Sequence, residues 1–393
     1  MAINIKNLEE LIQKKAYAVT SSTPTSDLGD IVEASLLATN SLREYDSAGL
    51  LPAATSNEKI AFVKSDKSVR FNNGSKWDTL TSGAAQAGSS GAATPSSARQ
   101  GTNNGFVMGG TPPVSNVIEK YPFASDGNGA DVGDLTESKY QLTAASSGDN
   151  IYTQGGYTGS AAVDKIEKIS TSTDGNATDV ANLLAPYRTG GGTQSATHGY
   201  AVGNNAATNI IQKHQFSNDG DATDVGDLLT TQNRSTGTSA SDDYGYLAGG
   251  YNPTQPDGDF ADTIQKWPFA TDGDATDVGD LSVNSYKAYN TGTSGDTHGY
   301  SHGGQGGLPI SFAHSLTIEK YSFSADGNST DVGDLTIAST EGAGSSSTTH
   351  GYGHGGSPPL TNVIQKYSFS SDGDATDVGD MLSSKKSLSG SQH

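Results

Sequence analysis

The feature that most constrains the fold is a 17-residue string that occurs six times between residues 118 and 380, with small changes from copy to copy. Its last copy reads IQKYSFSSDGDATDVGD. The Asp-Gly pairs of the six copies begin at Asp126, Asp174, Asp219, Asp272, Asp326 and Asp372. The spacings are 48, 45, 53, 54 and 46 residues. A period near 50 residues predicts a solenoid, a propeller or an array, in which neighbouring units bury each other's apolar faces.

One repeat has the pattern of four short strands. In the fifth copy, residues 317–323 alternate in the manner of a strand, the Asp-Gly pair at Asp326 is a hairpin-turn signal, and residues 329–335 form a second strand. Residues 297–304, THGYSHGG, predict a third strand, and the polar stretch 282–296 has room for a fourth. Four short strands per repeat predict a propeller blade, so six copies predict a mainly β, six-bladed propeller.

Two sets of residues recur at the same place in the repeats. A Gly-Gly pair ends the THGY strand, where the backbone turns with positive φ, and a lysine follows Ile-Glu or Ile-Gln. The pairs are Gly109-Gly110, Gly155-Gly156, Gly249-Gly250, Gly303-Gly304 and Gly355-Gly356, with Gly203-Asn204 in the third copy. The lysines are Lys120, Lys168, Lys213, Lys266, Lys320 and Lys366. We interpret both sets as architectural, since a catalytic site would break the symmetry of a repeat.

The lysine and the Asp of Thr-Asp-Val lie on strands that a hairpin joins. We therefore expect a cross-strand ion pair within each blade, as between Lys366 and Asp377, with a stabilisation of roughly 0.2–1 kcal/mol. The chain ends in LSSKKSLSGSQH, which matches the stretch preceding THGY in other copies. This predicts that the C-terminus supplies a strand to the first blade; the alternative donor is residues 96–104, SSARQGTNN.

The first 80 residues have a different pattern. Residues 7–18 and 25–47 have helical spacing of apolar residues, with Asn7 as a cap. Residues 58–80 predict a small meander of strands IAFV, SVRF and KWDTL. We expect an α+β module over 1–80, a Gly/Ala/Ser-rich linker over 81–97 and the propeller over 98–393.

The repeat resembles the blades of kelch-like β-propellers: Gly-Gly, an aromatic strand, a hairpin and a strand that ends at Leu. The resemblance covers about residues 94–393. Kelch blades usually carry a Trp in the last strand, and TDVGDL has none. The resemblance therefore implies a divergent kelch-like repeat.

The layout resembles virion proteins of tailed bacteriophages, and the repeats look like those of structural and tail-fibre proteins of marine phages. The motifs are the IAFV…SVRFNNGSKWDTL meander, DG-x-x-TDVGDL and THGY-x-x-GG. The resemblance implies that residues 1–80 dock on other virion proteins and that the propeller is displayed outward. It implies a component assembled in the host cytoplasm and present as a homo-oligomer on the particle.

Composition excludes several classes of protein. There is no Cys, which excludes a disulfide scaffold and a thiolate metal site. The net charge is −20, of which −19 falls on residues 85–393, so we expect no binding to nucleic acid through its phosphates. Residues 1–15 hold no apolar core of a signal peptide, and no apolar run is long enough for membrane insertion.

The Asp-rich turns are the one candidate for a cofactor. Asp372, Asp374 and Asp377 supply clustered oxygens of the kind that calcium prefers. The turn has no terminal bidentate Glu, and three copies carry Asn at the third position. We favour a turn in which these side chains bind their own backbone, with no metal. The histidine pairs His298/His302 and His350/His354 lie too far apart along a strand to share a zinc, and we expect them on the blade surface or the channel wall.

No catalytic motif is present, so we expect a binding protein and no enzyme. Aromatic residues in the longest insertions, Tyr251, Phe260 and Phe312, are the candidates for contact with a host cell-surface glycan or protein. The resulting hypothesis is a tail-fibre or tail-associated protein for host attachment. The alternatives are a purely structural head, neck or tail decoration protein, and a cell-encoded kelch adaptor.

Overall fold

The computed structural model describes residues 44–45, 51, 60–63, 68–72, 77–80, 99–206, 208–234, 237–252, 259–282, 288–306 and 314–393. The chain forms two compact units, residues 1–94 and 95–393. In the described part of the chain, no helix is long and apolar enough to cross a membrane.

The first unit contains a four-stranded sheet of β1 (Glu44–Tyr45), β2 (Ile60–Val63), β3 (Ser68–Asn72) and β4 (Trp77–Leu80). Strands β2 to β4 form the predicted antiparallel meander. Strand β1 pairs in parallel with β2, so the helix predicted over 25–47 is wrong for these two residues. The rest of that segment and the first predicted helix lie outside the described residues.

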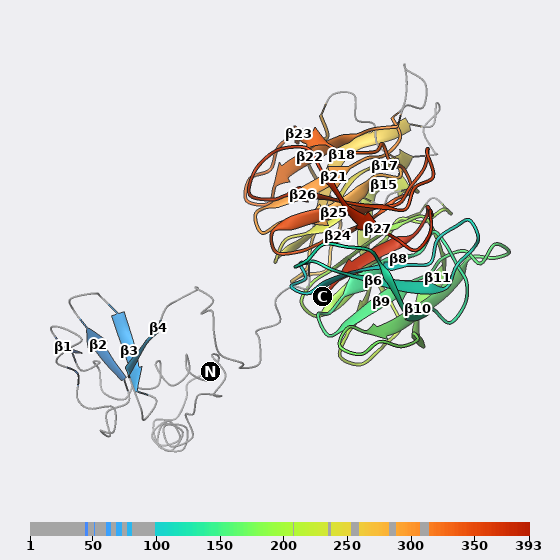
Figure 1. Cartoon of the computed structure of the whole chain (residues 1–393). Coiled ribbons are helices and arrows are strands. Elements are labelled where there is room, and N and C mark those ends of the chain that lie inside the picture. The colour runs from blue at the N-terminus through green and yellow to red at the C-terminus, as the bar shows by residue number, and fades with distance from the viewer. Residues whose placement is uncertain are drawn as a thin grey trace. The chain divides into compact units, whose positions relative to one another are not determined.

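The second unit is a β-propeller of six four-stranded antiparallel blades, as the repeat predicted (Figure 1). Blade 1 consists of β28 (Ser389–Gln392), β5 (Asn104–Met108), β6 (Val117–Pro122) and β7 (Ala130–Asp134). Blade 2 consists of β8 (Thr143–Ser146), β9 (Asn150–Gln154), β10 (Val163–Ser170) and β11 (Thr178–Tyr187). Blade 3 consists of β12 (Gly191–Gln194), β13 (His198–Val202), β14 (Thr208–Gln215) and β15 (Thr223–Gln232).

The other three blades repeat this order from the inner to the outer strand. Blade 4 consists of β16 (Thr238–Ala240), β17 (Tyr244–Asn252), β18 (Asp259–Pro268) and β19 (Thr276–Asp280). Blade 5 consists of β20 (Thr291–Ser294), β21 (His298–His302), β22 (Thr317–Ser322) and β23 (Thr330–Asp334). Blade 6 consists of β24 (Ala343–Ser346), β25 (His350–His354), β26 (Val363–Ser368) and β27 (Thr376–Asp380).

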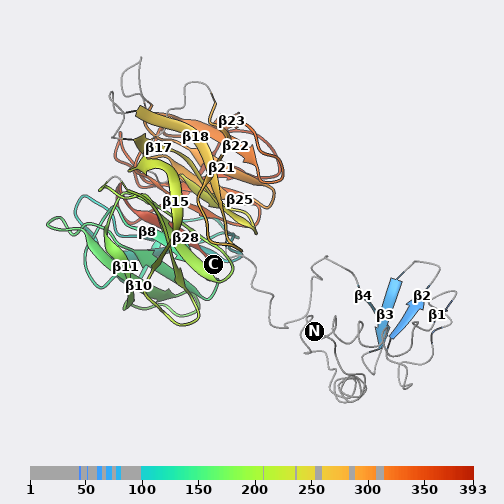
Figure 2. The same cartoon turned by 180° about the vertical axis from the view of Figure 1, so that it is seen from behind.

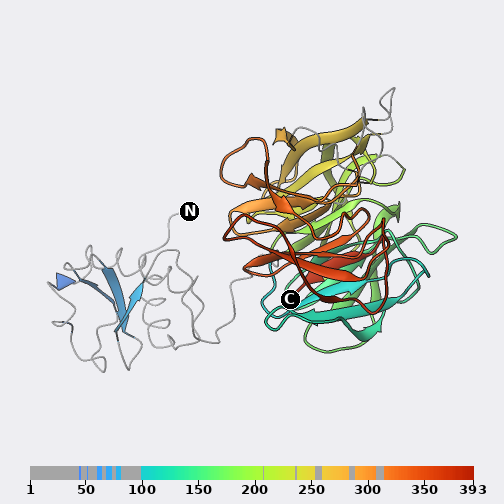
Figure 3. The same ribbon diagram turned by 45° about the horizontal axis from the view of Figure 1, so that its top comes forward.

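The C-terminal strand closes the ring, as the sequence predicted. Strand β28 pairs with β5 in the register Ser389 to Met108 and Gln392 to Gly105. Figure 2 shows the C-terminus and β28 beside β8, the inner strand of blade 2. Strand β28 contacts this strand as well as its pairing partner β5. The cyan blade at the start of the propeller lies against the red blade at its end (Figure 3). Closure removes the two free sheet edges that an open array would expose.

An aromatic side chain from the third strand of one blade fills the space between blades. It packs against the preceding blade. Tyr121 of β6 donates to or accepts from Ser345 Oγ at 2.5 Å and binds His354 Nε2 at 2.7 Å, both in blade 6. A Cβ at Gly105, opposite Tyr121, would collide with the tyrosine ring. The Gly of the THGY strand therefore makes room for the aromatic ring. In blade 2 the ring is replaced by Ile169, and the facing Gly is replaced by Ile151, so the packed volume is kept.

His302 and His354 lie between blades. Both are buried, at 2% and 1% exposure, and each contacts a tyrosine hydroxyl of the next blade. The expectation that they lie on the blade surface or line the channel is therefore wrong. The third strand needs a polar partner for its tyrosine hydroxyl, and the histidine supplies it.

The Gly-Gly pairs have the positive φ that the sequence predicted; Gly355 and Gly356, for example, have φ of 58° and 107°. The Asp-Gly segment, in contrast, is a seven-residue loop, as between Ser322 and Thr330, and not a tight hairpin. It reaches across to the outer strand of the preceding blade. In blade 1, Gly127 N donates to Val378 O at 2.9 Å.

Candidate functional site

The residues that recur in every repeat join one blade to the next. The first Asp of each Asp-Gly loop pairs with the repeat lysine of the preceding blade, so that six ion pairs encircle the propeller. They are Lys120–Asp174, Lys168–Asp219, Lys213–Asp272, Lys266–Asp326, Lys320–Asp372 and Lys366–Asp126. The predicted pairing of Lys366 with Asp377 is wrong, because Lys366 faces Thr376 in the register of its own blade.

The third residue of the loop explains why Asn and Asp interchange there. Its side-chain oxygen accepts a hydrogen bond from a backbone N–H in the outer strand of the preceding blade. Asn128 accepts from Asp380 N and Asp374 accepts from Asp334 N, both at 3.0 Å. The same contact occurs at all six interfaces. Either side chain serves, since both present an acceptor oxygen.

The calcium candidates each have a protein partner. Asp372 pairs with Lys320, Asp374 accepts from Asp334 N, and Asp377 accepts from Gly379 N at 3.2 Å in an Asx turn that holds a β-bulge. Among the described residues no group of three His, Asp or Glu side chains is arranged to hold a metal ion. These oxygens are therefore used by the blade architecture.

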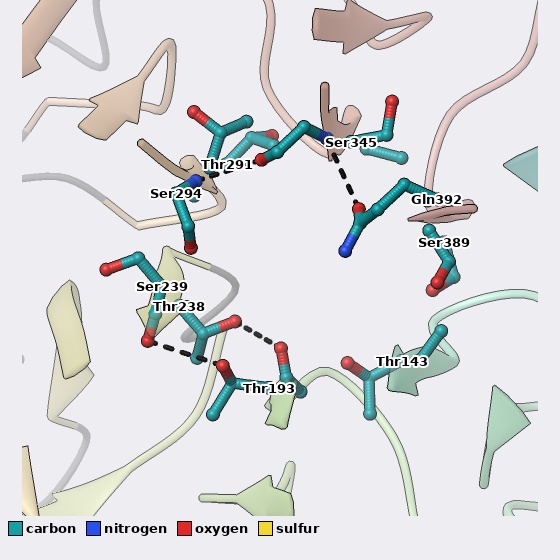
Figure 4. A pocket seen from close by; sticks show the side chains of 18 of the residues that line it. Thr143, Thr193, Thr238, Ser239, Thr291, Ser294, Ser345, Ser389 and Gln392 are labelled. Carbon is teal, nitrogen blue, oxygen red and sulfur yellow. Dashed lines mark hydrogen bonds between the residues drawn. The ribbon is translucent and has the colours of Figure 1, made fainter. Parts of the chain in front are cut away.

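The inner strands of the six blades surround a central channel. Its cavity has a volume of about 80 Å³ and is lined mainly by Gly, Thr, Ser and Gln residues of β8, β12, β16, β20, β24 and β28, with Leu142, Ala144, Ala343 and Leu388 among them. Figure 4 shows Thr, Ser and Gln side chains of successive inner strands around this cavity, with Thr238 Oγ1 donating to Gly192 O at 2.6 Å and Gln392 Oε1 accepting from Ser346 N at 3.2 Å. Among the described residues that line it, Arg99 is the only one with a charged side chain.

The two ends of the channel differ. We call the end with the Asp-Gly loops and the turns between first and second strands the entry face, because the chain enters the propeller there. Arg99 pairs with Asp242 and Asp296, which lie in those turns of blades 4 and 5. We call the opposite end, from which the loops after Gly-Gly emerge, the loop face.

A ring of six residues with left-handed backbone surrounds the channel at the loop face. Their φ values lie between 54° and 58°. They are Gln141, Thr189, Arg234, Tyr289, Glu341 and Ser387. Five backbone hydrogen bonds connect successive members, such as Ser387 N to Glu341 O at 2.6 Å. Each lies two to four residues before the first residue of the inner strand of its blade, so the ring forms the mouth of the channel.

The residue before each ring member faces the residue after Gly-Gly of the same blade. In blades 2, 4, 5 and 6 this contact is an isolated β-bridge, such as Tyr140–Tyr157 in blade 2 and Asn233–Tyr251 in blade 4. In blade 1 the corresponding bridge joins Thr111 to Lys386. The mouth thus has the same backbone in each blade but unrelated side chains. The six-fold symmetry of the side chains is therefore broken at the mouth.

Arginine and tyrosine side chains gather at this mouth. The Arg188 guanidinium lies 4.2 Å from the ring centroid of Tyr157, and the Arg234 guanidinium lies 5.0 Å from that of Tyr251 and 5.1 Å from that of Tyr289. Burial raises the pKa of the Tyr289 hydroxyl, and Arg234 opposes this rise. Glu341 pairs with Lys386 at 3.1 Å. All these side chains are partly buried.

Of the three receptor candidates, one lies at the mouth. Tyr251, in β17, lies beneath Arg234. Phe260, in β18, is its backbone partner across the sheet, although its side chain lies outside the described residues, as does all of Phe312. The sequence-based reasoning missed Tyr157, Arg188, Arg234 and Tyr289. The sequence did contain a signal for this region, because the residues directly after Gly-Gly differ between repeats whose strands are otherwise similar.

The fold and the mouth define a six-bladed β-propeller with an asymmetric channel mouth. Comparison with known proteins adds no family: the sequence matches no protein-family model and no curated protein.

Proposed function

We propose that this chain is a virion protein of a tailed bacteriophage, a tail fibre or tail-associated component, and that its propeller attaches the particle to the host surface. The observation that supports the attachment role is that repeated and unrepeated residues lie in different parts of the propeller. The repeated residues all join blades, while the unrepeated Arg and Tyr side chains gather at the loop-face mouth, opposite the point where the chain enters at Arg99.

This arrangement suits a protein that is held from one side. Residues 1–80 would bind other virion proteins, and a homo-oligomer would present several mouths to the host. The phage assignment itself rests on the resemblance of the repeats and of the N-terminal meander to marine phage structural proteins. Binding is favoured over catalysis, because the described mouth residues include a single carboxylate, Glu341, which Lys386 neutralises.

The test measures saturable binding of fluorescently labelled full-length protein to a panel of marine bacteria. The variant Tyr157→Ala/Tyr251→Ala removes both aromatic faces beneath the arginines. Its matched control is Tyr244→Ala on the entry face, where Lys266 lies 4.9 Å from the ring centroid. We expect the double variant to lose binding and the control to keep it.

The alternative decoration role gives a different result. A protein that binds none of the bacteria, yet incorporates into particles through residues 1–80, would be structural only. Equal binding by the double variant and the wild type would place attachment away from the mouth.

A further inference from the structure

Two arginines of the propeller have no carboxylate partner among the described residues. Every other described cation of residues 99–393 has one: Arg99 and ten lysines each lie within 4 Å of an Asp or Glu oxygen. Arg188 and Arg234 are the exceptions, in a protein of net charge −20. Both lie at the loop-face mouth, on neighbouring blades.

Their position is fixed by the tyrosines. A guanidinium stacked on an aromatic face gains cation–π attraction, and its N–H donors, which lie in its own plane, stay available. No described residue accepts a hydrogen bond from the Arg188 guanidinium, while the Arg234 side chain binds the Tyr289 hydroxyl. The mouth therefore holds two positive groups with unused donors. Both are held in place before any ligand arrives.

The neighbouring groups are polar. Gln141, a member of the left-handed ring, has a buried Oε1 that accepts no hydrogen bond from the described residues. Thr189 and Ser387 occupy two further ring positions, where their buried hydroxyls donate to Arg188 O and to the Glu341 carboxylate. Thr, Ser and Gln side chains surround the channel beneath (Figure 4). The described part of the mouth thus combines two cationic groups, aromatic faces and an amide oxygen without a hydrogen-bond donor.

We propose that the mouth binds an acidic saccharide, with Arg188 and Arg234 on its carboxylate. This rests on the proposed attachment role and names its ligand class. Arg binds carboxylates through paired, charge-assisted hydrogen bonds. The C–H groups of a sugar ring pack on the electron-rich faces of tyrosines, and a sugar hydroxyl supplies the donor that Gln141 Oε1 lacks among the described residues. An acidic peptide is less well matched, because it would also need apolar pockets for its neighbouring side chains.

The experiment titrates full-length protein with tetragalacturonic acid by calorimetry at low salt. The comparison ligand is the methyl ester of the same oligomer, which keeps the sugar rings and loses the charge. The variants are R188Q and R234Q, and the matched control is R99Q at the entry face, where the arginine already has two aspartate partners. Thermal melting confirms that each variant is folded.

We expect the acid to bind and the ester to bind at least tenfold more weakly. R188Q and R234Q should each weaken binding of the acid about tenfold or more, which corresponds to about 1.4 kcal/mol, and R99Q should change it less than twofold. Added salt should weaken binding, as charge screening requires. Tetraglutamate, tested in parallel, should bind more weakly than the saccharide.

Three results would overturn the proposal: no binding of the acid, equal binding of acid and ester, or unchanged affinity in both arginine variants. Tighter binding of tetraglutamate would assign the mouth to an acidic peptide instead. The outcome is separable from that of the attachment role. If wild-type protein binds bacteria and the arginine variants bind them equally well, the saccharide proposal fails alone. If the acid binds but no bacterium does, the attachment role fails alone.

Discussion

The ammonium of Lys366 lies 2.6 Å from a carboxylate oxygen of Asp126, 240 residues earlier in the chain, and this contact completes the ring of six inter-blade ion pairs. It joins the last blade to the first, beside the interface that β28 closes. The aspartates of the ring are between 33% and 58% exposed. Solvent therefore screens each pair, and its net contribution to stability is small.

The ring predicts a small coupling energy at each interface. We expect a double-mutant cycle with Lys320→Met and Asp372→Asn to give a coupling of about 0.2–1 kcal/mol in urea unfolding. The physical reason is that Coulomb attraction is offset by desolvation and by the entropy of holding two side chains. A coupling above 2 kcal/mol would show that the pair is desolvated in a way its exposure does not indicate.

Strand β28 is predicted to be essential for the ring. Deleting residues 388–393 exposes the edge of β5 and removes the inner strand of blade 1. We expect insoluble protein or the loss of a single cooperative melting transition, because an open propeller has two free sheet edges. The control Ser391→Ala keeps the strand and should melt within a few degrees of wild type. A deletion variant that melts normally would mean that another segment can close blade 1.

The buried pair of Lys139 and Glu167 gives a sharper prediction. Both side chains are 0% exposed, and Nζ lies 2.7 Å from Oε2. Burial lowers the pKa of Lys139, and Glu167 opposes that shift. We expect Glu167→Gln alone to destabilise the protein by about 3–5 kcal/mol, since it leaves a buried charge without a partner.

The chain itself supplies the matched rescue for this pair. In blade 6 the equivalent positions are Gln365 and Ser339, and Gln365 Oε1 still accepts a backbone hydrogen bond from Thr336. The double variant Glu167→Gln/Lys139→Ser should therefore recover most of the loss in chemical denaturation. If the double variant is as unstable as the single one, the cost arises from packing and not from the uncompensated charge.

Chelation is predicted to leave the propeller unchanged. Because Asp372, Asp374 and Asp377 each bind a protein group, removing calcium should expose no unpartnered carboxylate cluster. We expect the melting temperature in EGTA and in millimolar calcium to agree within one or two degrees. A melting temperature that is higher by about 5 °C or more in calcium would show that these turns bind the metal.

The periodicity allowed the number of blades, the strands and the closing segment to be predicted, because these depend on local patterns and on counting. The partners across blades were not predicted. The hairpin pattern pairs Lys366 with Asp377 of its own blade, since sequence spacing says nothing about how a loop reaches a neighbouring sheet. Only the closed ring brings Lys366 to Asp126.

One long-range partnership was nevertheless readable from the sequence. Three repeats carry Glu after the first Ile, and in two of them, at Glu119 and Glu167, the structure pairs this Glu with a lysine that lies two residues before a member of the left-handed ring, Lys385 and Lys139. Repeats with Gln at that place, such as Gln365, have a neutral residue there. Such covariation between repeats reports contact. The mouth gave the opposite signal, variation without a partner, which is typical of a surface that binds something outside the chain.

Acidification should destabilise the propeller through its buried histidines. Burial lowers the pKa of His214 and of His354 to about 4, from 6.5. His354 is held neutral, since Nδ1 donates to Ala343 O at 3.1 Å while Nε2 binds the Tyr121 hydroxyl. The unfolded chain binds a proton at each histidine below pH 6.5, whereas the folded chain binds it only near pH 4. Stability is therefore full above pH 6.5 and falls as the pH drops toward 4, by about 3 kcal/mol per histidine.

The variant His354→Gln tests this, because blade 2 already carries Gln154 at the equivalent buried position. Its unfolding free energy should depend less steeply on pH between 6.5 and 4 than that of wild type, whatever its stability at pH 7. His350→Gln, at a partly buried position four residues away, should change that slope much less. Parallel pH profiles for wild type and His354→Gln would show that His354 takes up its proton in the folded state, with the Tyr121 contact rearranged.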